Sequence, residues 1–515
     1  MTTHIDRAQI EKDVSEYYRY GMFSHKWETS EPLFKGVVDK EVYKLRDSPT
    51  QEKLGDPLTQ EKLKTFCQIV RDDGLKWAWS DTCCINQEDP TVLQEALVSM
   101  FKWYEGSALT VVYLRDVPFR RLVKSIWNQR AWTLQEYHAS KVVRFYNEDW
   151  TLYKNLDIRN HKDSPEILEE MQEATNISAS ALKTLRPGLG DIREKLRLAS
   201  TRQSTRVEDA AYSLFGIFSA VGISAIYGEG EASLGRLLAN LLTRSGDLNI
   251  LAWTGESGPF NSCLPARIVV FNGPTTSHIL PPISDAEMES IVTASHDSLD
   301  IDKALELYDH LKRLPMPKFA ETRMTIPCIA FQLPALPAPR RTPLFRIYRV
   351  NTVPFGMVKI KTQQDLSRMG HLYLVHPWLD TLLEHEGKHG GEVPDEGDDG
   401  DEEPYDDGND EGTEPPYEEI DDDEDDDDWL PEPETPSHPA PRQMIPEPMD
   451  QETRARRMVV RLRQPFGALL FTLVPTERRT PDYKRVAADS LITVRFRENV
   501  SLSDILAKVR VIDVL

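Results

Sequence analysis

Two short motifs place polar side chains where a buried α/β core would normally hold apolar ones. The first, Asp81-Thr-Cys-Cys-Ile-Asn-Gln87, follows an apolar stretch that we expect to form a short buried strand over residues 75–79. It precedes Glu88-Asp-Pro90, a sequence typical of a helix start. Because ligands of open α/β sheets bind at the carboxyl ends of the strands, this motif predicts a site at that edge.

The second motif is Arg130-Ala-Trp-Thr-Leu-Gln-Glu136. We expect it to lie on one helix over residues 125–138, with the next strand over residues 142–146. Trp132 and Glu136 are four residues apart, so a helix would place the indole ring and the carboxylate on one face.

Strand-like and helix-like stretches alternate over residues 17–150. An apolar run ends at Phe23, a helical stripe runs from Leu93 to Tyr104, and a strand-like run covers residues 109–114. This alternation predicts an α/β domain with a parallel sheet and helices on both faces.

The residue patterns change along the chain and predict four parts. They are an α/β domain (1–155), a helical continuation (156–250), a β-rich C-terminal domain (251–383 and 451–515) and an acidic insert (384–450). The β-rich domain is predicted from runs rich in β-branched residues: 267–271, 325–332, 344–349, 356–360, 371–375, 458–462, 468–474 and 491–496. The insert is too polar to bury a core, so it is expected to be disordered.

The net charge of −23 is concentrated in one tract. Residues 392–434 hold 25 Asp and Glu and no Lys or Arg, which leaves 61 basic against 59 acidic residues elsewhere. The body of the protein is therefore near neutral, and electrostatic binding of nucleic acid by the whole protein is not expected. The acidic run 421–428 is expected to be a solvated loop, with loose binding of basic partners as the alternative.

The cysteines and the chain start favour a cytoplasmic protein. Five cysteines fit neither a disulfide framework nor a zinc site, which favours a reducing compartment. Cys83 and Cys84 are expected to be buried small residues, since no activating base is nearby in the sequence. The first fifteen residues lack the apolar core of a signal peptide, and no apolar run is long enough for a transmembrane helix.

One apparent metal motif is rejected. His385-Glu-Gly-Lys-His389 matches the His-Glu-x-x-His pattern, whose chemistry needs both imidazoles on one face of a stable helix. Gly387 lies inside the motif and Gly390-Gly391 follows it, so the helix is poorly supported. We expect no metal site.

With the upstream segment Tyr20-Gly-Met-Phe-Ser24-His-Lys-Trp27, the two motifs resemble the fungal heterokaryon incompatibility (HET) domain. That family carries an aromatic-x-x-hydrophobic-Ser-x-x-Trp-Gly segment, then Asp-x-x-Cys-Ile-Asn-Gln, and later Arg-x-Trp-Thr-x-Gln-Glu. All three occur here in that order. Glu28 stands where the family usually has Gly, and His25 where it often has Tyr. Residues 208–218 and 226–231 resemble the helical segment that follows the HET core in many fungal proteins.

The HET domain is similar to the Toll/interleukin-1 receptor (TIR) domain, so the resemblance implies a TIR-like, flavodoxin-like parallel sheet. Plant-type TIR domains carry Ser-x-Trp-Cys-x-x-Glu-Leu on the helix that supplies the glutamate of an NAD-cleaving site, and Trp132 and Glu136 align with it. The resemblance implies an NAD glycohydrolase with NAD as its substrate and no resident cofactor. Glu136 would be catalytic, and the candidate substrate-binding residues are Ser24, Trp27, Asp81, Asn86, Arg130 and Trp132.

These residues also have structural interpretations. Glu136 would pair with Arg130 or cap a backbone turn, and Ser24 would be a turn residue. The others would be core aromatics or members of a hydrogen-bonded network that holds the loops: Trp127, Trp132, Asp81, Asn86 and Gln87.

By this resemblance the chain is a heterokaryon incompatibility protein that acts in non-self recognition and triggers programmed cell death. The alternative is a non-enzymatic signalling module that recruits partners through its TIR-like surface. The expected partners are other incompatibility or signalling proteins, and further copies of the chain itself.

Overall fold

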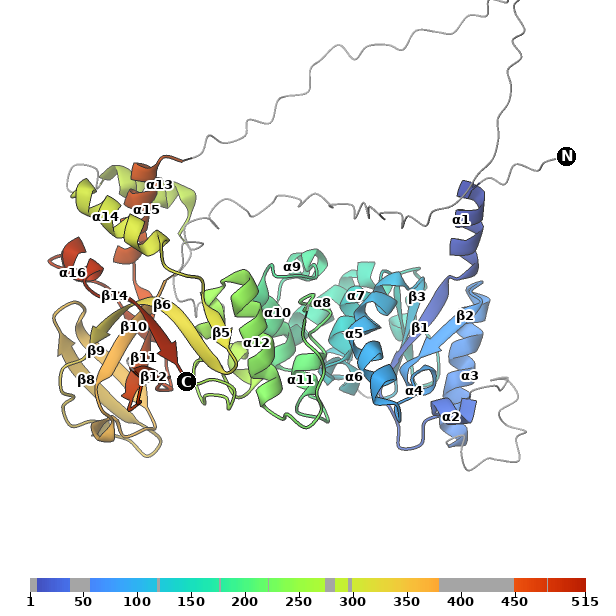
Figure 1. Cartoon of the computed structure of the whole chain (residues 1–515). Helices are drawn as coiled ribbons and strands as arrows, with labels where there is room; N and C mark the ends of the chain where they lie inside the picture. Colours follow the sequence, from blue (N-terminus) through green and yellow to red (C-terminus); the bar gives the residue numbers. More distant parts are fainter. Residues whose placement is uncertain are drawn as a thin grey trace, which may run out of the picture.

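The computed structural model of the chain arranges a parallel sheet, a helical middle region and a β-rich region in succession along the molecule (Figure 1). The structure describes residues 7–37, 56–117, 121–175, 177–220, 222–273, 283–294, 299–378, 449–478 and 480–515. Residues 384–448 of the predicted acidic insert, including His385 and His389, lie outside the described residues.

The N-terminal sheet has four parallel strands in the order β2-β1-β3-β4, as the sequence predicts for an α/β domain. The strands are β1 (Tyr20–His25), β2 (Trp77–Ser80), β3 (Leu109–Leu114) and β4 (Val143–Asn147). The strand predicted over residues 75–79 is found as β2, but the prediction that it is buried is wrong. β2 lies at the edge of the sheet with one neighbour, and Trp77 is 47% exposed.

Helices cover both faces of this sheet, as predicted. The helices of this part of the chain are α1 (Arg7–Tyr17), α2 (Phe34–Val37), α3 (Pro57–Asp72), α4 (Asp81–Cys84), α5 (Pro90–Gly106), α6 (Ile126–Gln129) and α7 (Thr133–Ala139), of which α1 is exposed over residues 12–17. Successive residues of β1 face opposite layers. Phe23 shares a core with α3, whereas Met22 shares a core with α5 and α7. The predicted helix start is also found, since the Asp89 carboxylate caps α5 at Thr91.

The single helix expected over residues 125–138 is broken into α6 and α7. Arg130 has an extended backbone, with φ −80° and ψ 142°. The backbone N–H of Ala131 donates to the carbonyl of Gln203, and the N–H of Gln203 donates to the carbonyl of Gln129. A tertiary β-bridge to Gln203 therefore takes the backbone hydrogen bonds that would have continued the helix.

The middle region is helical, as expected for the continuation over residues 156–250, and consists of α8 (Pro165–Thr175), α9 (Ala179–Thr184), α10 (Ile192–Ser200), α11 (Asp209–Tyr212) and α12 (Ala232–Ser245). Tyr212, Phe215 and Phe218 are buried at helical spacing. Gly228 and Gly230 both have positive φ, and their N–H groups donate to the Glu208 carboxylate in the turn before α12.

Short 3₁₀ turns connect several elements: η3 (Leu122–Lys124), η4 (Tyr153–Asn155), η5 (His161–Asp163), η6 (Leu248–Leu251), η7 (Ile268–Asn272) and η8 (Leu366–Arg368). The strand predicted over 267–271 is wrong, because this run forms η7. Ile268 and Phe271 are three residues apart and both buried, while Val269 is 55% exposed. That spacing suits three residues per turn, not the alternation of a strand.

The C-terminal region is β-rich, as predicted. Its strands are β5 (Lys318–Ala320), β6 (Arg323–Gln332), β7 (Arg340–Arg341), β8 (Arg346–Thr352), β9 (Gly356–Thr362), β10 (Leu372–Pro377), β11 (Phe466–Val474), β12 (Asp482–Arg485), β13 (Ile492–Val494) and β14 (Val509–Val514). Its helices are α13 (Asp285–Ala294), α14 (Ile301–Lys312), α15 (Gln451–Arg463) and α16 (Leu502–Leu506).

The strand predicted over 458–462 is wrong, because this run belongs to α15. Asp450 caps the helix at Thr453, and Ala455, Met458 and Leu462 are buried at helical spacing. The β-branched residues within the run are buried as well, so tertiary burial outweighs their strand propensity.

Two sheets make up the β-rich region. In the larger one, β6 pairs with β10 and β14 as well as β5, so the path β10-β11-β12-β14-β6 returns to β10. The smaller sheet has the order β7-β8-β9. It lies at the opposite end of the molecule from the parallel sheet (Figure 1).

One apolar core runs through all three regions, across the boundaries predicted at residues 155 and 250. It includes Met22 of β1, Leu237 of α12 and Ile512 of β14. Arg485 anchors the junction to the β-rich region by donating to the carbonyls of Leu251 at 2.9 Å, Trp253 at 2.9 Å and Cys263 at 3.2 Å.

We expect Gly216→Ala to destabilise the protein by roughly 1–3 kcal/mol, the usual cost of overpacking. A Cβ at Gly216 would overlap the Cβ of Phe101 on α5, where the helical region packs against the sheet domain. Gly190→Ala is the control, because a Cβ there meets nothing within 4 Å. Denaturant unfolding would test this. Equal midpoints for the two variants would contradict the close packing.

Candidate functional site

Ser24 lies at the carboxyl end of β1 and connects two of the predicted site elements. Its hydroxyl donates to Oε2 of Glu136 on α7 and accepts a hydrogen bond from Nε1 of Trp127 on α6, at 2.7 Å. Ser24 is fully buried, Trp127 is 1% exposed and Glu136 is 6% exposed. The helix break between α6 and α7 thus lets two short helices present an indole and a carboxyl to one strand end.

Burial, together with the smaller effect of the negative charge of Asp81, raises the pKa of Glu136 to about 7. The hydrogen bond from Ser24 and the positive charges of Arg130 and Arg202 oppose this shift. The raised pKa favours the protonated form of this carboxyl more than in an exposed glutamate. A carboxyl with this pKa changes charge within the physiological range, which is typical of functional sites.

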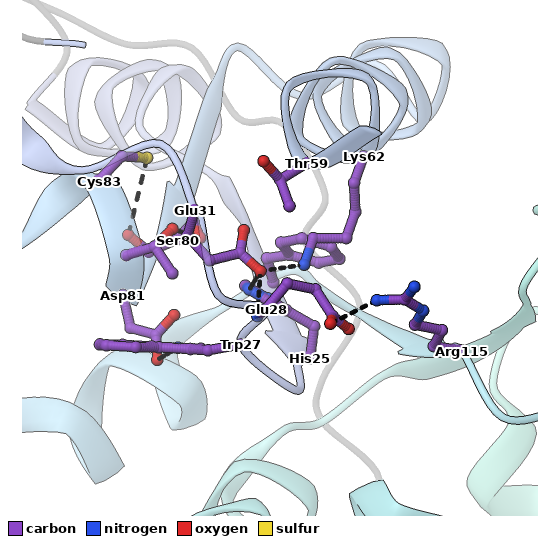
Figure 2. A network of polar contacts seen from close by, with 12 residues as sticks. His25, Trp27, Glu28, Glu31, Thr59, Lys62, Ser80, Asp81, Cys83 and Arg115 are labelled. Carbon is purple, nitrogen blue, oxygen red and sulfur yellow. Dashed lines mark hydrogen bonds and ion pairs between the residues drawn. The ribbon is translucent and has the colours of Figure 1, made fainter. Parts of the chain in front are cut away.

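Asp81 is the second carboxyl of the site and follows β2. Its Oδ2 accepts a hydrogen bond from Nε1 of Trp27 at 2.8 Å (Figure 2). Burial raises the pKa of Asp81 to about 6, while Arg130 and the Trp27 hydrogen bond lower it. Arg130 donates to the carbonyl of His25 at 2.6 Å and acts as a counter-charge that the two carboxyls share. The structure therefore joins Ser24, Trp27, Asp81, Arg130 and Glu136.

Two other predicted site residues point elsewhere. The side chain of Asn86 accepts a hydrogen bond from the backbone N–H of Glu88 at 3.3 Å, within the turn that leads to α5. Trp132 hydrogen-bonds to the Asp209 carboxyl of the helical region, a contact that lowers the pKa of Asp209 against the larger effect of burial. Trp132 and Glu136 thus interact with different regions of the protein.

The loop after β1 is fixed by buried charge, which no sequence motif indicated. The Glu31 carboxylate pairs with Lys62 of α3, and its Oε1 accepts the backbone N–H of Glu28 at 2.8 Å and lies 3.8 Å from His25 Nε2 (Figure 2). Burial lowers the pKa of His25 well below 6.5, so this imidazole is neutral. Glu28, the departure from the family pattern, pairs with Arg115 after β3.

Arg202 is a further residue that sequence patterns missed. Its guanidinium donates to the carbonyl of Arg130 at 3.0 Å, to Thr133 Oγ1 at 2.9 Å and to Asn128 Oδ1 at 3.1 Å. It belongs to the segment after α10, outside every motif, and its role follows only from the bridge between Gln203 and Arg130.

A cavity of ≈ 340 Å³ opens at the carboxyl ends of β1 and β3, the edge at which the sequence predicts a site. It is lined by Lys26, Glu28, Tyr113, Arg115, Asp116, Ile126 and Trp127. Trp127 is thus shared, because it lines the cavity while its Nε1 reaches Ser24. Glu136 does not line the cavity and is connected to it through Ser24 and Trp127.

The cysteines do not take part in this site. All five are free thiols. The prediction that Cys83 and Cys84 are both buried is wrong for Cys84, which is exposed, and Cys83 is partly buried. They lie in α4, a single turn after an edge strand, where one side is open to solvent. Within the described residues, no three His, Cys, Asp or Glu side chains are arranged to hold a metal ion.

Residues 20–118 match the protein family described as heterokaryon incompatibility protein (HET). The chain carries a HET domain. The vegetative incompatibility protein HET-E-1 of Podospora anserina is 36% identical over 234 residues, which cover 42% of this chain and 16% of that protein. The chain therefore spans less than a fifth of this relative's length. No solved structure matches the chain.

The family match contains Ser24, Trp27 and Asp81, whereas Arg130 and Glu136 lie beyond its end at residue 118. The structure joins both groups in one hydrogen-bonded and charged cluster.

Among the helices that the structure describes, none combines the length and hydrophobicity that a bilayer crossing demands.

We expect Glu136→Gln to stabilise the HET domain relative to wild type at about pH 8 and to have little effect at about pH 5. The pKa of Glu136 is raised from 4.5 to about 7, so the folded protein holds a proton that the unfolded chain loses. As pH rises between these two pKa values, ionisation of Glu136 therefore lowers the free energy of unfolding, by on the order of 3 kcal/mol in total. Gln remains neutral throughout.

Thermal unfolding of wild type and variant between about pH 5 and pH 8 measures this effect. Glu105→Gln is the control, since Glu105 is exposed on α5 and its substitution makes the same chemical change outside the site. A Glu136→Gln difference that stays constant with pH would show that the buried carboxyl does not titrate in this range.

Proposed function

We propose that this chain triggers an incompatibility response that ends in cell death, and that its HET domain does so by cleaving NAD at Glu136. The family match and the similarity to a vegetative incompatibility protein support the incompatibility role. The proposed place of action is the cytoplasm, and the proposed activators are other incompatibility proteins or further copies of this chain.

The topology supports a TIR-like sheet. The strand order β2-β1-β3-β4, with all strands parallel, agrees with the first four strands of the flavodoxin-like order. In such sheets, ligands bind outside the carboxyl ends of the strands where the strand order reverses, here between β1 and β3. The cavity lies at these two strand ends, and its volume is at the lower end of the range of about 300–1,000 Å³ for ligand pockets.

The observation that carries the enzymatic proposal is the arrangement of Glu136, Ser24 and Trp127 behind that cavity. The carboxyl is buried, and its pKa is raised to about 7. Low local polarity strengthens its interaction with any positive charge that forms beside it. Lys26 supplies a cation at the cavity for the phosphates of a dinucleotide, and Arg115 would do so by exchanging its partner Glu28.

The proposed reaction breaks the bond between the ribose C1′ and the nicotinamide nitrogen. Nicotinamide leaves with the bonding electron pair and is neutral, so it needs no general acid. The ribosyl cation left behind is stabilised by the ionised Glu136 carboxylate. Water then adds to C1′ and loses a proton, which gives ADP-ribose. Nothing is oxidised or reduced.

The same geometry implies a closed resting state. Trp127 lines the cavity and its indole N–H donates to Ser24, whereas neither Ser24 nor Glu136 is part of the lining. A substrate reaches the carboxylate only when Trp127 moves and the Ser24 hydroxyl exchanges partners. Activation by a partner or by self-association would therefore act on α6 and the break that follows it.

We expect the full-length protein to release nicotinamide from NAD, and Glu136→Gln to reduce the rate by about 10²–10³-fold, the usual effect of removing one preorganised electrostatic group. Release should increase with pH through about 7, because the carboxylate form stabilises the cation and the pKa of Glu136 is about 7. Chromatography of the nicotinamide released by wild type and variant over a range of pH measures both effects.

Glu105→Gln controls for the substitution at an exposed position and should keep the wild-type rate. Far-UV circular dichroism establishes that each variant is folded. A folded Glu136→Gln protein that releases nicotinamide at the wild-type rate would exclude Glu136 as the catalytic carboxylate.

A second candidate function is a non-enzymatic module that recruits other proteins. It is favoured by the 6% exposure of Glu136 and by the absence of this residue from the cavity lining. In that case Glu136 would be a structural partner of Ser24 alone.

Expression in a fungal host separates the two functions. We expect wild-type full-length protein to arrest growth and Glu136→Gln to abolish the arrest while accumulating to the same level. Growth arrest by a folded Glu136→Gln protein would favour recruitment, since that variant keeps the size and neutral hydrogen bonding of the side chain and loses only its charge.

A further inference from the structure

The outer face of the sheet β7-β8-β9 concentrates positive charge. Residues 340–361 contain six basic residues and no Asp or Glu: Arg340, Arg341, Arg346, Arg349, Lys359 and Lys361. We call the solvent side of this sheet, formed by Arg340, Ile347, Arg349, Asn351, Met357, Lys359 and Lys361, the basic face. Four of the six basic residues, Arg340, Arg349, Lys359 and Lys361, lie on this face.

Burial and register fix which side chains form this face. Tyr348 and Val350 of β8 and Val358 and Ile360 of β9 are buried in the core. Because side chains alternate along a strand, the residues between them point to solvent, and Arg349 and Lys359 are exposed. The sheet is at the far end of the molecule, away from the parallel sheet (Figure 1).

The pairing across the two strands leaves like charges unneutralised. Arg349 lies directly opposite Lys359 in the antiparallel register, and Lys361 lies opposite Ile347. Like charges directly opposite each other destabilise a sheet. Neither Arg349 nor Lys359 has an ion pair or a side-chain hydrogen bond with another described residue. Lys361 packs over the ring of Phe345 at 3.7 Å, which supplies no full counter-charge. An anion from outside this sheet would therefore neutralise the charge of the basic face.

The same chain carries a matching polyanion. Residues 392–434 hold 25 Asp and Glu and no basic residue. This acidic tract is attached to the β-rich region at both ends, because β10 ends at Pro377 and α15 begins at Gln451.

The attachments are long enough for the tract to reach the basic face. The connecting segments 379–391 and 435–448 contain 13 and 14 residues. At up to about 3.3–3.6 Å per residue, each can span roughly 40–50 Å. A compact domain of about 200 residues has a radius of gyration of roughly 16 Å. Attachment also gives the tract a high effective concentration, in the millimolar range, that a free polyanion would have to match.

We propose that the basic face of β7-β8-β9 is the docking site of this chain's own acidic tract, residues 392–434. Many weak ion pairs hold the tract there, so the contact depends on salt and can be exchanged. The docked tract covers the face against nucleic acids and other polyanions. A partner with a stronger basic surface can withdraw the tract, and that withdrawal exposes the face.

Zero-length carbodiimide cross-linking of the full-length protein tests this, because the reagent joins a lysine to a carboxylate in direct contact. We expect cross-links from Lys359 and Lys361 to residues 392–434, with a yield independent of protein concentration and lower at about 1 M than at about 0.1 M salt. Exposed lysines remote from the face, Lys102 on α5 and Lys318 on β5, serve as internal controls. Equal yields at Lys102, Lys318 and Lys359 would overturn the proposal.

A pair of variants tests the role of the face itself. Arg349→Ser removes one unpaired charge from an exposed strand position and should lower the Lys359 cross-link about two- to five-fold. Arg313→Ser removes another exposed charge, just after α14, and should leave the Lys359 cross-link unchanged. An identical yield in both variants would contradict docking on this face.

A further variant changes the tract and leaves the folded regions intact. Substituting the acidic residues of the run 421–428 by Asn and Gln should reduce the cross-links to Lys359 and allow a short duplex DNA to bind the protein. If wild-type protein already binds duplex DNA through Arg349 at low salt, with no cross-link to the tract, the occupant is nucleic acid and the proposal is wrong.

Discussion

The hydroxyl of Ser24 holds together the carboxyl end of β1, the indole of α6 and the carboxyl of α7. All three groups are buried, so each needs a partner inside the protein. Removing this hydroxyl would leave the Trp127 indole N–H and the Glu136 carboxyl without their hydrogen bonds to Ser24. An unsatisfied buried polar group costs about 1–3 kcal/mol. The break between α6 and α7 is what allows both groups to reach Ser24.

Charge organises the site around this contact. Two carboxyls with raised pKa values, Asp81 and Glu136, share Arg130 as a counter-charge, and Arg202 supports Glu136 from the helical region. The helical region is therefore not an appendage of the HET domain, because Arg202 and the bridge at Gln203 shape the site directly. An apolar core that continues from β1 to β14 connects this site to the rest of the chain.

The sequence predicted the layers of the fold better than the limits of individual elements. The parallel sheet, the helical middle and the β-rich end follow from periodicity. The run 458–462 does not, because its β-branched residues are buried within α15. The helix over 125–138 fails for a different reason, since the hydrogen bonds that interrupt it come from Gln203, about seventy residues away.

The sequence by itself determined which polar residues follow the strand ends, and the resemblance grouped Glu136 with Ser24, Trp27, Asp81, Asn86, Arg130 and Trp132 as candidate site residues. Only the tertiary structure decided their partners. Trp132 hydrogen-bonds to Asp209, and Asn86 accepts a hydrogen bond within its own turn. Glu136 is connected to the cavity through Ser24 and Trp127, and Arg202 donates to the carbonyl of Arg130. The physical reason is that short-range spacing fixes where a side chain starts on an element, whereas its hydrogen bonds and its pKa depend on burial and on charges that distant segments bring close.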